Sequence, residues 1–325
     1  MTPREIIAEA WAITLREKSL RRWGFTAALF ETLLDVKLLI YQVYFLISYL
    51  QGDPIGFFKI EELLFAALPF WGFVTFIIVL LILFAVEIFL PKMCLGAIIG
   101  LAAKAHKKEE VKGGLVLALY NFFAIFAIRE LFVLGGVTTM ITVISLILRY
   151  MGEGFRGTLI GLTVGFWLLS NLFRFFANFA EEEAVIKKSG VFESMGRSFK
   201  LIISHLRHVV FLLMLLFIIS LRVLLNALVL LVLPAIIIGI GILLAMFLST
   251  TLTVIISTIV GIVLVFVASY FFAYLHVFQQ TTWTITYMEL SKLKDLDIIE
   301  LEEKPKEEAA AEPEAPAVPE GGEAS

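Results

Sequence analysis

Eight ionisable residues occur within stretches of this sequence that are otherwise apolar. They are Glu31, Asp35, Lys37, Glu87, Arg129, Glu130, Arg174 and Arg222. A charged side chain near the centre of a bilayer costs at least about 2.5–3.5 kcal/mol, so such residues usually pair with one another or mark the route of an ion or proton. Asp35 and Arg222 fall nearest the middle of their apolar segments, and we expect these two side chains to form an ion pair.

Spacing puts several of these charges on common helix faces. Glu31 and Asp35 are four residues apart, which is about one helical turn. A second series, with spacings of three and four, comprises Asn171, Arg174, Asn178, Glu181 and Glu182. We therefore add Asn171 and Asn178 to the eight charges as candidate intramembrane polar residues. Two interpretations stay open: the polar groups pin helices together in pairs, or they form a path for an ion, a proton or a small anion.

Motifs for catalysis, cofactors and metals are not found in the sequence. It contains no glycine-rich phosphate loop, no HExxH pattern and no nucleophile–histidine–acid arrangement. The single cysteine, Cys94, excludes an internal disulfide and a cysteine-cluster metal site, and we expect a buried thiol. His205 and His208 are three apart without a nearby acidic cluster. We expect a protein that is not an enzyme and holds no cofactor or metal.

The composition of the chain is typical of a protein whose outer surface contacts lipid. The chain is 60% hydrophobic and 17% charged, with a mean hydropathy of +0.95, whereas soluble domains are about 45–50% apolar and about 25% charged. A spanning helix needs about 20 mainly apolar residues. Six segments qualify: 24–50, 66–90, 115–135, 157–180, 209–233 and 253–279. Backbone in lipid must satisfy its own hydrogen bonds, so the sequence predicts an all-α polytopic bundle of about six spans.

Two shorter apolar stretches complicate this count. Residues 137–148 follow Gly135–Gly136 and either extend the third helix beyond a kink or lie at the outer surface. Residues 235–248 follow Pro234, and we expect them to form a short re-entrant or interfacial piece. Both are too short to span a bilayer alone.

The distribution of Lys and Arg predicts the orientation. Residues 1–22, 91–114 and 181–208 hold fifteen, whereas 51–65 and 149–156 hold three. Cytoplasmic loops carry the excess of basic residues. We therefore expect a multi-pass protein of the cell membrane with both termini in the cytoplasm, whose basic loops contact anionic membrane lipids and not nucleic acid.

We divide the chain into three parts. Residues 1–22 form an amphipathic N-terminal helix, 23–290 the transmembrane domain, and 291–325 an acidic tail with 4 Lys and 11 Asp or Glu. The composition of the tail is typical of disorder, and the tail is a candidate docking site for a basic cytoplasmic protein.

A weak internal repeat is suggested by three amphipathic segments, each followed by a helical hairpin. They are Glu5–Leu20, Leu95–Lys108 and Val191–His205, with a period of about 90–95 residues. Amphipathic elements also suit cytoplasmic interfaces without any duplication, so both explanations remain. The polar stretch Tyr274–Tyr287 is rich in aromatic residues and Thr, and we expect it to form a membrane–water belt.

Three stretches resemble a known group of prokaryotic membrane proteins: Ala8–Phe25, Asn178–His205 and Tyr274–Leu290. They are similar to the membrane domain found beside some glycerophosphoryl diester phosphodiesterases. The resemblance implies a six-helix module of unassigned role. In such fusions the chemistry belongs to a separate soluble barrel, for which this chain has no room, so the resemblance carries over no catalytic residue.

Two functions follow as hypotheses. The first is a non-enzymatic membrane module that organises partners or lipids, and the alternative is a transporter or channel for a small ion or solute. Transport predicts a continuous polar cavity that joins Asp35, Arg222 and the series from Asn171 to Glu182. A scaffold predicts isolated charge pairs without a passage.

Overall fold

The structure is a computed structural model that describes residues 1–52 and 59–293. The side chains of 59–61, 63, 215–231, 234, 250, 251 and 254 are outside the description. Within the described residues every regular element is a helix, which confirms the all-α prediction. The tail from 294 onward lies outside the described residues, so its predicted disorder and docking role stay predictions.

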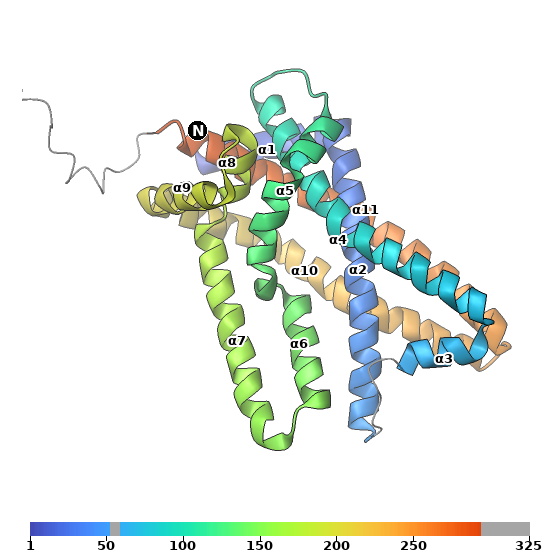
Figure 1. The fold of residues 1–325 in the computed structure, drawn as a ribbon. Helices are drawn as coiled ribbons and strands as arrows, with labels where there is room; N and C mark the ends of the chain where they lie inside the picture. The colour runs from blue at the N-terminus through green and yellow to red at the C-terminus, as the bar shows by residue number, and fades with distance from the viewer. Residues whose placement is uncertain (53–58, 294–325) are drawn as a thin grey trace, which may run out of the picture.

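The described chain forms eleven α-helices and one 3-10 helix (Figure 1). Their bounds are α1 Pro3–Arg16, α2 Lys18–Leu50, α3 Lys59–Ala67, α4 Phe70–His106, α5 Gly114–Leu131, η1 Val133–Gly135, α6 Val137–Tyr150, α7 Glu153–Phe176, α8 Ala180–Lys187, α9 Val191–Ser204, α10 Leu206–Ala245 and α11 Thr250–Leu290. α1, α8 and α9 gather at the end of the molecule that carries the N-terminus (Figure 1). We call this the N-terminal end.

Five helical segments in the described part are long and apolar enough to cross a bilayer. They are Lys18–Leu50, Phe70–His106, Gly114–Leu131, Glu153–Lys187 and Ile255–Leu290. The predicted span 209–233 lies within α10, a continuous helix of 40 residues whose side chains 215–231 are not described. Large apolar side chains such as Phe166 and Phe271 are exposed on these helices, as expected when lipid is the solvent. The protein is membrane-embedded.

The third span is interrupted. α5 ends at Leu131, η1 covers Val133–Gly135, and α6 begins at Val137. α6 continues beyond α5 toward the end opposite the N-terminus and α7 returns beside it (Figure 1). The stretch 137–148 therefore extends the third helix beyond a break, which was one of the two alternatives. Gly135 occupies the break because a Cβ there would lie 3.1 Å from Ser170 Oγ.

Two proline positions do not end their helices. α10 runs through Pro234 to Ala245, and α4 runs through Pro91 to His106. The expectation that 235–248 forms a separate short piece is therefore wrong for 235–245, and a place of this stretch at the interface stays a prediction. A proline within a membrane helix is tolerated because neighbouring helices and local adjustment satisfy the freed backbone carbonyl.

The second predicted amphipathic segment is also wrong as a separate element. Leu95–His106 is the last part of α4, and almost all of its residues are buried. Small residues allow this close packing: a Cβ at Gly100 would lie 2.8 Å from Leu117 Cδ1 of α5. The other two predicted segments do form separate helices, α1 and α9. The threefold repeat is therefore not present at its middle unit.

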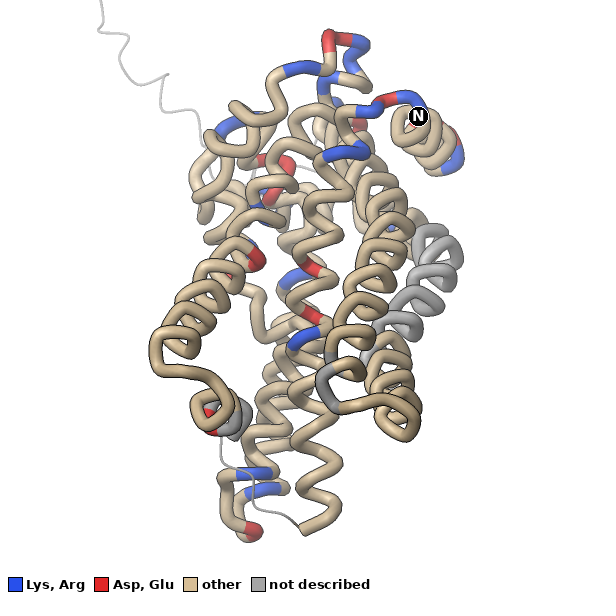
Figure 2. Tube along the Cα trace, turned by 90° about the vertical axis from the view of Figure 1, so that its right-hand side faces the viewer, with Lys and Arg blue, Asp and Glu red and all other residues tan. Residues whose placement is uncertain are grey.

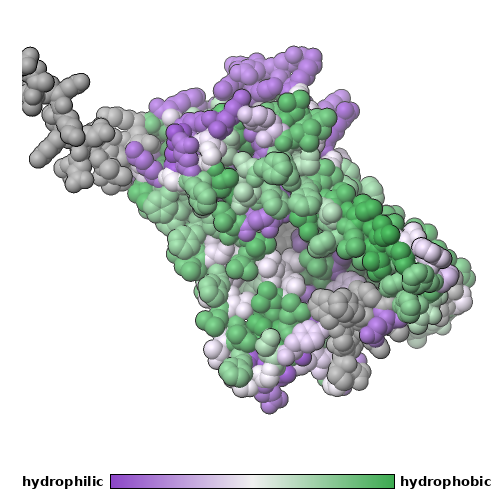
Figure 3. All heavy atoms as spheres, viewed as in Figure 1, coloured by the Kyte–Doolittle hydropathy of each residue, from purple (hydrophilic) through white to green (hydrophobic). Residues whose placement is uncertain are grey.

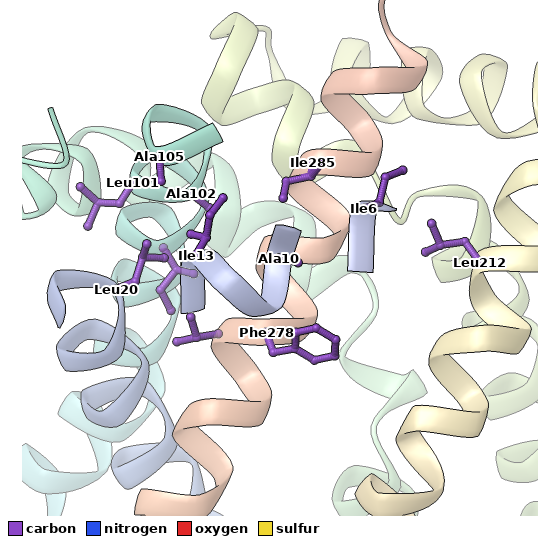
Figure 4. Close-up of a cluster of buried hydrophobic side chains, with 12 residues drawn as sticks. Ile6, Ala10, Ile13, Leu20, Leu101, Ala102, Ala105, Leu212, Phe278 and Ile285 are labelled. Atoms are coloured by element: carbon purple, nitrogen blue, oxygen red, sulfur yellow. The ribbon is translucent and has the colours of Figure 1, made fainter. Parts of the chain in front are cut away.

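The end of α11 lies in the protein core instead of a membrane–water belt. Thr282, Ile285 and Tyr287 are at most 1% exposed, which contradicts the expectation for Tyr274–Tyr287. The cause is that α1 lies across α11, so that Ile6, Ala10 and Phe278 belong to one buried cluster (Figure 4). The threonine hydroxyls are satisfied locally, as in the 2.8 Å bond that Thr282 donates to the carbonyl of Phe278.

Charged residues gather mainly at the N-terminal end, and a few lie midway along the apolar helices (Figure 2). In space-filling view the middle of the molecule is predominantly hydrophobic, with a small hydrophilic area in a hollow at mid-height (Figure 3).

Candidate functional site

A polar cavity of about 580 Å³ lies beside the interruption between α5 and α6. Residues of α2, α4, α5, α6, α7, α8 and α11 line it. Its charged and amide-bearing lining residues are Glu31, Asp35, Lys92, Arg129, Glu130, Arg174, Asn178, Glu181, Glu182, His276, Gln279 and Gln280. A polar cavity of this size among apolar spans is the main candidate site, since ligand pockets usually measure about 300–1,000 Å³.

Helix α2 brings Asp35 to the cavity from near the middle of its own length. Asp35 is the residue after the midpoint of the 33-residue helix, and the whole helix is about 50 Å long at 1.5 Å per residue. Its Oδ1 accepts a hydrogen bond of 3.1 Å from Thr138 Oγ1 on the first turn of α6. Glu31 lies one turn earlier and also lines the cavity.

The break in the third span exposes backbone groups that an intact helix would satisfy. On one side, the carbonyl of Gly135 accepts a 3.0 Å hydrogen bond from Asn171 Nδ2 of α7. On the other side, the first bond within α6 is the one that Met140 N–H donates to Gly136 O. The amides of Val137, Thr138 and Thr139 precede it, and all three residues line the cavity. Irregular backbone at this depth is tolerated where it lines a water-filled space.

Arg129 links two acidic groups from different helices. Its guanidinium lies 3.5 Å from Glu31 Oε1 and 3.1 Å from Glu181 Oε1. A second pair joins Lys92 of α4 to Glu130 of α5. These charged residues come from α2, α4, α5 and α8 and all form part of the cavity wall. The cavity is therefore charged on several sides, and its charges do not all lie on one helix face.

Three consecutive glutamates at the start of α8 bind side chains of α5, α9 and α11. Glu181 pairs with Arg129 of α5, and Glu182 Oε1 accepts a 2.7 Å bond from Gln280 Nε2 of α11. Glu183 accepts bonds from Tyr287 of α11 and, over 2.9 Å, from Arg197 of α9. Glu182 and Glu183 are at most 2% exposed. This run therefore fixes the start of α8 against three neighbouring helices.

Several polar atoms of the cavity wall have no partner among the described residues. They are Glu182 Oε2, Asn178 Nδ2 and His276 Nε2, each buried without a hydrogen bond. Arg174 lines the cavity, and no carboxylate of the described part lies within ion-pair distance of it. Unsatisfied buried polar groups are rare and costly, so the three buried atoms mark a place for water or a ligand.

The ten sequence-based candidates fall into three groups. Glu31, Asp35, Arg129, Glu130, Arg174 and Asn178 line the cavity. Lys37 and Glu87 form a separate ion pair of 2.5 Å between α2 and α4, and Asn171 binds the broken backbone. The side chain of Arg222 is outside the description, so its pairing with Asp35 stays a prediction.

Sequence reasoning missed Lys92, His276 and Gln280 as parts of this site. Lys92 follows Pro91, which suggested a helix end at the interface. His276 and Gln280 belong to the stretch that suggested a membrane–water belt. Their spacing of four residues on one helix was the available signal.

The site has the chemistry of a binding site for charged or polar groups. Within the described residues, no group of three or more His, Cys, Asp or Glu side chains is arranged to hold a metal ion. Cys94 is fully buried, as expected. Comparison of the chain with family models, with curated proteins and with solved structures finds no match.

Proposed function

We propose that this chain is a membrane transport protein that binds a small polar solute in the cavity beside the interrupted third span. The observation that carries the proposal is the meeting of both charge signs with the first turn of α6 in one cavity among apolar spans. Interrupted helices with free backbone groups are a common way to build a solute site at the membrane midplane.

The cavity supports transport over a purely scaffolding role. A scaffold requires its charges in isolated pairs, as Lys37 and Glu87 are. The other five candidate charges whose side chains are described instead line one cavity: Glu31, Asp35, Arg129, Glu130 and Arg174. The alternative hypothesis from the sequence is therefore the one we adopt, and binding without catalysis remains the proposed activity.

For orientation we propose the cell membrane, with the N-terminal end in the cytoplasm. The support is the concentration of basic residues in 1–22, 91–114 and 181–208, because cytoplasmic connections carry the excess of Lys and Arg. Membrane lipids at this end are the proposed contacts of the basic loops.

Hydration of the cavity is the first test. In a Cys94→Ser background, which removes the only cysteine, Thr139→Cys places a thiol in the cavity wall. A charged maleimide should label this cysteine in native membranes. The control is Leu168→Cys on α7, a position 58% exposed on an apolar helix and therefore in contact with lipid. Equal protection of both cysteines would refute a water-filled cavity and with it the proposed transport.

A further inference from the structure

An apolar groove adjoins the polar cavity. It has a volume of about 350 Å³ and lies between the break in the third span, α7 and α9. Its lining is almost wholly apolar and includes Leu134, Phe166, Phe173 and Phe199. Phe166 and Phe173 are more than half exposed in the absence of lipid. The groove therefore faces the hydrocarbon of the bilayer.

The groove and the cavity share a wall. Phe132 and Ala177 line both spaces. Consecutive residues of α7 also divide between them, because Phe173 lines the groove and Arg174 lines the cavity. A ligand at this boundary would contact charged groups on one side and aromatic side chains on the other.

The charges of the cavity favour a ligand that carries both signs. Among the described lining residues, Arg174 is a cation without a carboxylate partner. Asp35 and Glu182 are carboxylates whose hydrogen-bond donors, Thr138 and Gln280, are both neutral. A phosphate is a good partner for a guanidinium, and an ammonium group for a free carboxylate. A ligand with a single charge would leave one of these groups unpaired.

We infer that the transported solute is an amphipathic lipid with a zwitterionic phosphate–ammonium headgroup. The headgroup occupies the polar cavity, with phosphate at Arg174 and ammonium at Asp35 or Glu182, and one acyl chain lies in the apolar groove. This inference rests on the proposed function and names its substrate class. The acyl chain of the lipid stays in hydrocarbon while its headgroup crosses the bilayer in a polar site. The polar site lowers the free-energy cost of moving the charged headgroup through lipid.

Binding to the purified full-length protein in a non-ionic detergent tests the inference. The ligands are lysophosphatidylethanolamine, lysophosphatidylglycerol, which has a phosphate and chain without the amine, and phosphoethanolamine, which has the headgroup without the chain. The readout is the thermal unfolding midpoint during titration at constant detergent. We expect lysophosphatidylethanolamine to raise the midpoint at concentrations at least about tenfold lower than either of the others, a difference of about 1.4 kcal/mol.

Variants separate headgroup binding from chain binding. Arg174→Gln should weaken binding of lysophosphatidylethanolamine by about tenfold or more. Phe173→Ala should weaken binding of this lipid and leave phosphoethanolamine unchanged. Leu168→Ala, on the same helix outside both spaces, is the matched control and should bind as the parent protein does. Because Arg174 is exposed and unpaired, its replacement should not prevent folding.

Each result has a distinct consequence. If phosphoethanolamine binds as tightly as the lysolipid, the substrate is a water-soluble zwitterion, and the lipid inference is wrong while transport survives. Equal binding of lysophosphatidylglycerol would refute the role of the ammonium group. If no ligand shifts the midpoint although Thr139→Cys is labelled, the lipid inference fails alone. Failure of that labelling overturns the proposed function itself.

Discussion

Asp35 Oδ1 accepts a hydrogen bond of 3.1 Å from the hydroxyl of Thr138, and this bond joins the unbroken helix α2 to the first turn of α6. The positive end of a helix dipole and a carboxylate favour each other at such a position. The break in the third span thereby faces an acid near the middle of α2. In an intact helix the backbone amides at this position would be bonded within the helix, and none would be free to face the carboxylate of Asp35.

Loss of the Thr138 hydroxyl should destabilise the protein. Thr138→Val keeps the shape of the side chain but leaves Asp35 Oδ1 without its donor, which we expect to lower the free energy of unfolding by about 1–3 kcal/mol. Thermal unfolding in detergent measures the change. Thr139→Val is the matched control, because no hydrogen bond joins Thr139 to Asp35. The same loss in both variants would show that the bond has no particular role.

Glu183 should contribute far more stability than Glu193, although both carboxylates pair with Arg197. The Glu183 side chain is 3% exposed and the Glu193 side chain 53%. Glu183→Ala leaves Arg197 and the Tyr287 hydroxyl without this buried acceptor and should cost about 3–5 kcal/mol. Glu193→Ala removes an exposed pair and should cost at most about 1 kcal/mol. Urea or thermal unfolding of the two proteins gives the comparison, and similar losses would contradict the assigned role of Glu183.

Close packing of α2 on α11 should make Gly24 intolerant of a methyl group. A Cβ at Gly24 would lie 2.1 Å from Val277 Cγ2 and 3.2 Å from the carbonyl oxygen of Ala273. Gly24→Ala should therefore destabilise the protein by about 1–3 kcal/mol through overpacking. Gly165→Ala on α7 is the control, because a Cβ there meets nothing within 4 Å. The measurement is the unfolding temperature of each variant. An unfolding temperature of Gly24→Ala equal to that of the parent protein would argue against the close contact of α2 with α11.

Hydrophobic length was enough to predict the helices but not where they end. The segment predicted as 66–90 is α4, which runs from Phe70 to His106. Its second half is buried by protein and not by lipid, because Gly96 and Gly100 let α5 approach closely. Hydropathy does not distinguish these two apolar surroundings. A proline within the run, Pro91, made an earlier end the natural prediction.

The site was only partly visible in the sequence for a related reason. Glu31, Asp35 and Arg174 stand out because a charge in an apolar run is conspicuous. Their grouping depends on how α2, α5, α7 and α11 pack, which spacing along one helix does not determine. Gly135–Gly136 was the one local signal of the break, since two glycines weaken a helix. That Asn171 would bind the freed carbonyl of Gly135 depends on α7 lying beside η1.

Access of a water-soluble reagent to position 139 from each side of the bilayer tests the transport proposal most directly. Thr139→Cys in the Cys94→Ser protein is reconstituted in vesicles of one orientation, and a charged maleimide is added outside or trapped inside. A site that alternates between the two sides predicts labelling from both, with Leu168→Cys unlabelled from either. Labelling from one side alone, or from neither, would contradict a cavity that carries a solute across the membrane.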